Sequence, residues 1–240
     1  MRFTIRALII LTFLAAVSLG LYHHYGQSTR QLLPTPELAF EKFADAAISF
    51  QASGDRKQAA RQFGDIKERY LDTEISQKSG ELATLLGRMQ NEDSNWREPL
   101  NPNTLALEQR IDYLVYHLRN AECYQMGQPG ACWILEPSQP NSAHELLKIG
   151  KPAVPKLIEL LEDRRPIRAV GYWRDFCPSS YTLLRYQDVA MQILHEIYDI
   201  PACKNHLWAE YHSDETPEMR KEINDYIEKQ WKNSTLNDAG

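Results

Sequence analysis

The residues best suited to recognition chemistry are concentrated in one stretch, 164–185, which reads RRPIRAVGYWRDFCPSSYTLLR. Arginine and aromatic side chains are enriched at binding hot spots, because they combine a large rigid surface with directional hydrogen bonds. The stretch therefore predicts an interaction surface. Its candidate residues are Arg164, Arg165, Arg168, Tyr172, Trp173, Arg174, Phe176, Tyr181 and Arg185.

A structural role for the same stretch is the alternative, and it is the one we favour. Trp173 and Phe176 would then fold back to cap the end of a helical stack, since an array of helices needs a covered end. The arginines would pair with neighbouring carboxylates instead of a ligand. Those carboxylates are Glu159, Glu162, Asp163 and Asp175.

No catalytic motif is found in the chain. The sequence lacks the nucleophile elbow G-x-S-x-G, the zinc-protease motif H-E-x-x-H and the phosphate loop G-x-x-x-x-G-K-[ST]. His117, His144 and His195 fall on predicted helices, where a histidine is more often packed or paired than catalytic. We therefore expect a protein that is not an enzyme and holds no cofactor.

Four cysteines, an even number, are typical of an exported protein with disulfide bonds. Cys123 and Cys132 flank the short glycine-rich segment YQMGQPGA, so we predict that they pair and leave Cys177 for Cys203. The sequence itself permits three pairings. No metal site is expected, since there is no C-x-x-C and no histidine at ligand spacing from a cysteine pair.

The N-terminus has the pattern of a membrane-targeting segment. Arg2 and Arg6 precede the apolar run 7–22, and no further Lys or Arg occurs before Arg30. This asymmetry places the first residues in the cytoplasm and the remainder on the periplasmic side. The segment predicts a single-pass anchor, which we favour, or a signal peptide whose removal would leave a secreted protein.

The bulk composition narrows the class of partner. A net charge of -5 and a pI near 5.8 argue against nucleic acid, because proteins that hold phosphates usually cluster Lys and Arg. The 43% hydrophobic content is sufficient to bury a core in a chain of 240 residues. We expect the partner to be another protein or a component of the cell envelope.

Apolar residues three and four positions apart recur along most of the chain, which predicts helices. The stretch AAISFQASGDRKQAARQFGDIKERYLDTEISQKSGELATLL resembles tetratricopeptide repeats over about one and a half units. Ala59, Phe63, Ile66 and Tyr70 occupy the matching positions, whereas Leu71 stands where that family usually has proline. The resemblance implies a helical hairpin closely packed through its small and aromatic residues.

A second segment, from Ser142 to Tyr198, resembles a HEAT repeat. It contains AVPKLIELLED and RYQDVAMQILHEI, separated by a stretch much longer than the usual HEAT turn. HEAT repeats are binding and scaffold modules, so the resemblance implies interaction and supplies no catalytic residue. Residues at positions typical of the motif are Asp163, Arg168, Asp188 and Ala190.

These patterns together predict an all-α chain, a short α-solenoid with a TPR-like part followed by a HEAT-like part. We expect the chain from Glu37 to Trp231 to be almost entirely helical, with Trp96 packed within an otherwise exposed linker. The expected division is an anchor or signal at 1–26, a linker at 27–36, a TPR-like module at 37–90, a linker at 91–103, a HEAT-like domain at 104–231 and a disordered tail at 232–240.

Three functions fit this sequence. The first is a membrane-tethered extracytoplasmic scaffold that binds a protein or an envelope component. The second is an enzyme that acts on an anionic sugar or peptide through the 164–185 insert, with an acid or base group that the sequence does not identify. The third is a purely structural domain.

Overall fold

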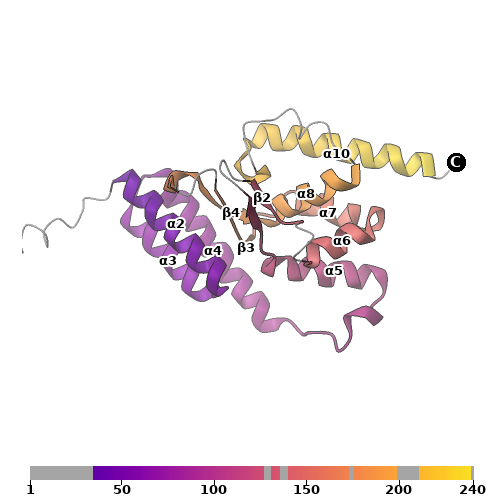
Figure 1. Ribbon diagram of the computed structural model, residues 1–240, viewed down its shortest axis with the longest axis horizontal. Helices are drawn as coiled ribbons and strands as arrows, with labels where there is room; N and C mark the ends of the chain where they lie inside the picture. Colours follow the sequence, from indigo (N-terminus) through magenta and orange to yellow (C-terminus); the bar gives the residue numbers. More distant parts are fainter. Residues whose placement is uncertain (1–34, 127–130, 136–139, 173–175, 199–210, 239–240) are drawn as a thin grey trace, which may run out of the picture.

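The computed structural model describes residues 35–126, 131–135, 140–172, 176–198 and 211–238. The described chain is mostly helical, as predicted, and it also contains two β-hairpins. A three-helix bundle forms one end of the molecule, and a second helical part forms the other (Figure 1). The assignment of these parts to TPR-like and HEAT-like repeats stays a prediction.

The bundle consists of α2 (Pro36–Ser53), α3 (Arg56–Arg69) and α4 (Glu74–Asn95). Each helix has an N-cap side chain that accepts a hydrogen bond from a backbone N–H three residues later, which satisfies a donor without an intrahelical partner. The caps are Thr35, Asp55 and Thr73. Successive helices run in opposite directions, so α2 and α4 begin at the same end of the bundle (Figure 1).

The apolar stripe predicted on the second helix of the bundle is confirmed. Ala59, Phe63, Ile66 and Tyr70 are each at most 5% exposed. Phe63 lies beside Phe43 of α2 with 5.3 Å between ring centroids, so the stripe fills the space between neighbouring helices.

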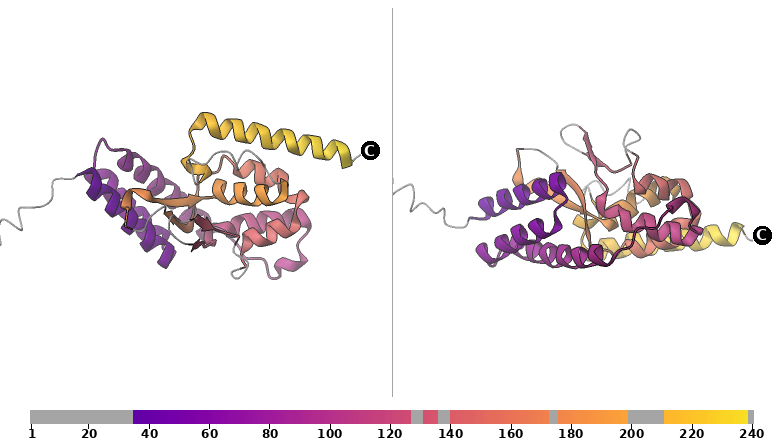
Figure 2. Two further views of the ribbon diagram at one scale, coloured as in Figure 1. Left: turned by 45° about the horizontal axis from the view of Figure 1, so that its top comes forward. Right: turned by 90° about the horizontal axis from the view of Figure 1, so that it is seen from below.

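The second part of the molecule contains α5 (Leu107–His117), α6 (Ser142–Ile149), α7 (Val154–Leu160), α8 (Tyr186–Tyr198) and α10 (Pro217–Asp238). Short 3₁₀ turns occur at Pro102–Thr104, Leu118–Asn120, Lys151–Ala153, Pro178–Ser180 and His212–Asp214. Figure 2 shows α10 lying along the outside of this part. Helix α10 continues through 232–238, where a disordered tail was expected, because no Gly or Pro interrupts those residues.

The two β-hairpins correct the expectation of an almost entirely helical chain. One pairs β1 (Tyr124–Met126) with β2 (Ala131–Trp133), and the other pairs β3 (Pro166–Tyr172) with β4 (Tyr181–Arg185). Strand β3 is buried on both faces, so its sequence lacks the alternation of apolar and polar residues that identifies a half-buried strand.

The β3–β4 hairpin lies between the two helical parts and contributes to both cores. Val170 and Leu183, which are register partners, pack into the core of the α2–α4 bundle. Ile167, Ala169 and Leu184 pack into the core of the second part. The hairpin therefore joins the two parts through buried apolar contacts.

The segment that precedes α10 is fixed against the hairpin and α8. Tyr211 is 5% exposed and lies directly over Gly171, where there is no room for a β-carbon. The buried carboxylate of Asp188 accepts hydrogen bonds of 2.7 Å from the backbone N–H groups of Arg185 and Ser213. These contacts hold the start of α10 in place.

Candidate functional site

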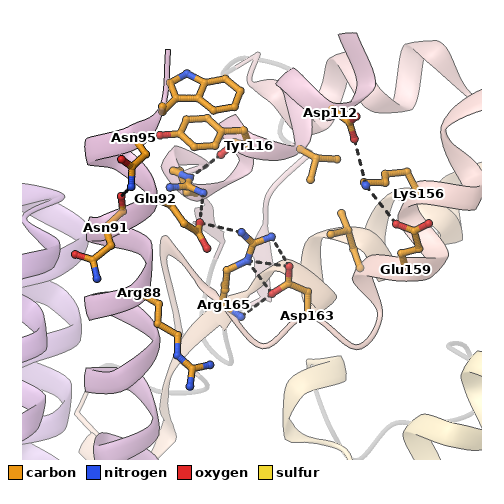
Figure 3. Close-up of a pocket in the computed structure, with 14 residues that line it drawn as sticks. Arg88, Asn91, Glu92, Asn95, Asp112, Tyr116, Lys156, Glu159, Asp163 and Arg165 are labelled. Atoms are coloured by element: carbon orange, nitrogen blue, oxygen red, sulfur yellow. Dashed lines mark hydrogen bonds and ion pairs between the residues drawn. The ribbon is translucent and has the colours of Figure 1, made fainter. Parts of the chain in front are cut away.

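A cleft of about 890 Å³ lies between α4 and the facing helices α5 and α7 (Figure 3). Its walls come from both helical parts of the molecule, and its lining is mainly charged and amide side chains. The lining residues are Arg88, Asn91, Glu92, Asn95, Trp96, Asp112, Val115, Tyr116, Arg119, Lys156, Glu159, Leu160, Asp163 and Arg165.

One wall is organised around the buried guanidinium of Arg119, which is only 1% exposed. It donates to Glu92 at 2.8 Å, to Asp93 and to the carbonyl oxygen of Tyr116 at 2.8 Å. Its central carbon lies 3.7 Å from the centroid of the Tyr116 ring, and the opposite face of that ring stacks on Trp96 at 3.5 Å. The expectation that Trp96 is packed is confirmed.

A second arginine connects the floor of the cleft to α4. The guanidinium of Arg165 donates to Asp163 at 2.6 and 2.9 Å and to Glu92 at 3.0 Å, and it lies 4.5 Å from the ring centroid of Tyr186. Glu92 therefore accepts from two arginines (Figure 3). Charge-assisted bonds of this kind fix both partners in position.

The wall opposite α4 holds another satisfied cation. Lys156 lies 3.2 Å from both Asp112 and Glu159. Burial lowers the pKa of Lys156, but its hydrogen bonds to Asp112 and Glu159 outweigh this and raise the pKa overall. The lysine therefore stays charged at neutral pH.

The pKa values of two other groups in the cleft are also shifted further from neutral pH. Burial acts to lower the pKa of Arg165, yet its hydrogen bonds and the negative charge of Asp163 raise it overall. Burial, followed by the hydrogen bond to Asp93, raises the pKa of Tyr116 to about 12. A general acid or base works best with a pKa near the operating pH, and these shifts move Lys156, Arg165 and Tyr116 away from it.

The arginines of the predicted interaction surface have separate contacts. Arg165 lines the cleft, whereas Arg164 and Arg185 both bind Glu81 of α4, at 3.0 and 2.8 Å. Arg168 donates to the carbonyl oxygen of Gln51 at the end of α2. The arginines thus bind α2 and α4. Among the described residues, Asp163 is the one predicted carboxylate partner that forms an ion pair with an arginine of this surface.

The aromatic residues of that surface are divided in the same way. Tyr172 and Tyr181 stack on each other across the hairpin at 4.9 Å. Phe176 is 71% exposed, so it does not fold back as the predicted cap would require. Trp173 and Arg174 lie outside the described residues.

The first of the two predicted disulfides is confirmed, because the sulfur atoms of Cys123 and Cys132 are 2.04 Å apart. Cys177 is half-buried, with its sulfur 3.2 Å from the hydroxyl of Ser179. Its predicted partner, Cys203, lies outside the described residues, so that second pairing stays a prediction.

Sequence reasoning missed most of the cleft. Glu92, Asp93 and Asn95 belong to the region predicted as a linker, but α4 continues to Asn95. A signal was available: QNEDSN at 90–95 contains neither glycine nor proline, so nothing in it ends a helix. Arg119 carries no comparable local signal, because its partners lie 26 and 27 residues earlier in the chain.

The described ranges contain neither a membrane-spanning helix nor a metal-binding cluster. No helix within them is both long and apolar enough to cross a bilayer, and the predicted anchor at 1–26 lies outside them. They also contain no group of three or more His, Cys, Asp or Glu residues able to hold a metal ion.

Comparison with known proteins adds no relative. No protein family, curated protein or solved structure matches this chain.

Proposed function

We propose that this protein is a non-catalytic, membrane-tethered binding protein of the extracytoplasmic side, which holds part of another protein or envelope component in the cleft between α4 and α5–α7. The observation that carries this proposal is the cleft itself, about 890 Å³ in volume and lined from both helical parts. Clefts between structural units are common ligand sites.

The electrostatics of the cleft favour binding over catalysis. Its buried arginine, Arg119, is fully occupied by Glu92, Asp93 and Tyr116. Groups fixed in this way give a rigid surface that needs no reorganisation when a partner arrives. The enzyme alternative gains no support from the insert, since the described arginines of 164–185 contact α2, α4 or Asp163.

The geometry also suits a tethered protein. The predicted anchor precedes α2, and α2 and α4 begin at the same end of the bundle (Figure 1). Residue 91 of the cleft lies 17 residues after Glu74, the first residue of α4. At a rise of 1.5 Å per residue this places the cleft about 25 Å along the helix from that end. A tether attached there would hold the cleft away from the bilayer.

Site-specific photo-cross-linking in the native membrane tests this function. A photoreactive amino acid replaces Asn95 in the cleft of the full-length chain or, as a control, Arg61 on the exposed side of α3. We expect a discrete adduct from position 95 and none from position 61, with the protein in the membrane fraction. Equal adducts from both positions, or none from either, would refute binding in the cleft. Recovery in the soluble fraction would refute the tether.

A further inference from the structure

The charges that line the cleft are almost completely paired with one another. Each carboxylate of the lining already has a cation: Glu92 has two arginines, Asp163 has Arg165, and Asp112 and Glu159 share Lys156. A positively charged ligand at Glu92 or Asp163 would therefore have to compete with an existing arginine pair.

Arg88 is the exception. It lines the cleft from α4 and is exposed, and within the described part of the chain its guanidinium has no carboxylate partner. Figure 3 shows it extending from the helix with no bond to another lining residue. An anionic group gains this guanidinium without breaking any pair, so the position beside Arg88 favours a negative charge.

Asn91 adds a second point of recognition beside Arg88. The two residues are three positions apart on α4, so their side chains share one face, about 5–6 Å apart at Cβ. A guanidinium matches the two oxygens of a carboxylate. An exposed asparagine amide both donates and accepts, as a peptide group does.

We infer that the cleft takes an extended polypeptide segment of the partner that carries an acidic side chain. Arg88 binds its carboxylate, and Asn91 binds the adjoining peptide group. This inference rests on the proposed function, because it names the part of the partner that enters the same cleft. In this inference Arg88, the unpaired charge of the lining, selects the ligand.

The aromatic residues of the cleft favour a peptide over an acidic sugar. Sugar rings pack on exposed aromatic faces, but Tyr116 has Trp96 at 3.5 Å on one side and Arg119 at 3.7 Å on the other. One face of Trp96 is occupied by the same stack. The stack thus covers both faces of Tyr116 and one face of Trp96, whereas Arg88 and Asn91 present exposed hydrogen-bonding groups.

Capped seven-residue peptides with a central Glu, Gln or Lys are suitable probes for the full-length protein. We expect the Glu peptide to bind about fivefold more tightly than the Gln peptide, as one exposed charge-assisted bond of about 1 kcal/mol provides. Arg88→Gln should bring this ratio to about one, and Arg88→Lys should retain part of it. Arg61→Gln removes the same charge from α3 and should leave the ratio unchanged.

Three results would overturn the inference. They are an unchanged Glu-to-Gln ratio in Arg88→Gln, equal binding of the three peptides by the parent protein, and binding of hyaluronan oligosaccharides in place of peptides. Because Arg88 has no ion pair to lose, the variant should unfold at the parent's temperature, which a thermal melt checks. Cross-linking at position 95 without a charge preference in peptide binding would remove this inference alone, whereas absence of cross-linking would remove the proposed function.

Discussion

Replacing Gly171 with alanine tests the packing of the segment before α10. A β-carbon at this position would lie 2.2 Å from Oη and 2.3 Å from Cζ of Tyr211, far inside van der Waals contact. The ring is buried, so it must shift by about 1 Å or leave its site. Overpacking of this kind costs about 1–3 kcal/mol, and losing a buried aromatic ring costs about the same.

We therefore expect Gly171→Ala to lower the free energy of unfolding by about 2–3 kcal/mol. For a chain of this size that corresponds to a fall in Tm of about 4 to 12 °C. Thermal unfolding followed by circular dichroism measures it. The matched control is Gly64→Ala on α3, where a β-carbon meets nothing within 4 Å, and which should stabilise the protein by up to about 1 kcal/mol.

A double variant identifies the cause of the effect. If the contact with Tyr211 is responsible, Gly171→Ala should cost almost nothing when Tyr211→Ala is already present, because the clashing ring is gone. A Gly171→Ala protein that melts within 1 °C of the parent would refute the reasoning. So would a cost that is unchanged by Tyr211→Ala.

Two further predictions concern charged groups. Arg119→Met and Arg165→Met should each lower the free energy of unfolding by about 2 kcal/mol, measured by urea denaturation. The double variant should lose about 0.5–1 kcal/mol more than the sum of the two, because Glu92 then loses both cations. Strict additivity would contradict this prediction. Burial raises the pKa of Asp188 to about 6, so its contribution to the free energy of unfolding is present at low pH and is lost as pH rises through 6. Burial lowers the pKa of His212 to about 4, so its contribution is present at higher pH and is lost as pH falls through 4. The two contributions oppose each other as pH falls. Between pH 6.5 and 4.5 the free energy of unfolding of Asp188→Asn should therefore fall by about 2 kcal/mol more than that of the parent protein. An identical pH profile for the two proteins would argue against this.

The fold was predictable wherever a single periodicity described the chain. The stripe from Ala59 to Tyr70 indicates the face that α3 buries, and the glycine-rich segment between Cys123 and Cys132 indicates the disulfide. Strand β3 was not predictable in this way, because burial on both faces removes alternation. Its paired strand is β4, which begins nine residues after β3 ends.

The candidate site was much less predictable than the helices. Glu92 meets Arg119 and Arg165, which lie 27 and 73 residues away in the chain. Such pairs are set by how distant helices pack, and no local spacing encodes them. The insert 164–185 was predicted as an interaction surface, and all four of its described arginines contact α2 or α4, because the hairpin brings them beside these helices.

The hairpin shared by both cores places residues from distant parts of the chain in one core. Val170 and Leu183 complete the core around Phe43 and Phe63, although Val170 follows Phe63 by 107 residues. At about 5–20 residues per second, the ribosome needs about 5 to 20 s to make that stretch. Throughout this time α2–α4 keep an uncovered apolar side, and closing so long a loop is slow. We therefore expect the nascent chain to expose apolar surface of the bundle until β4 has been synthesised.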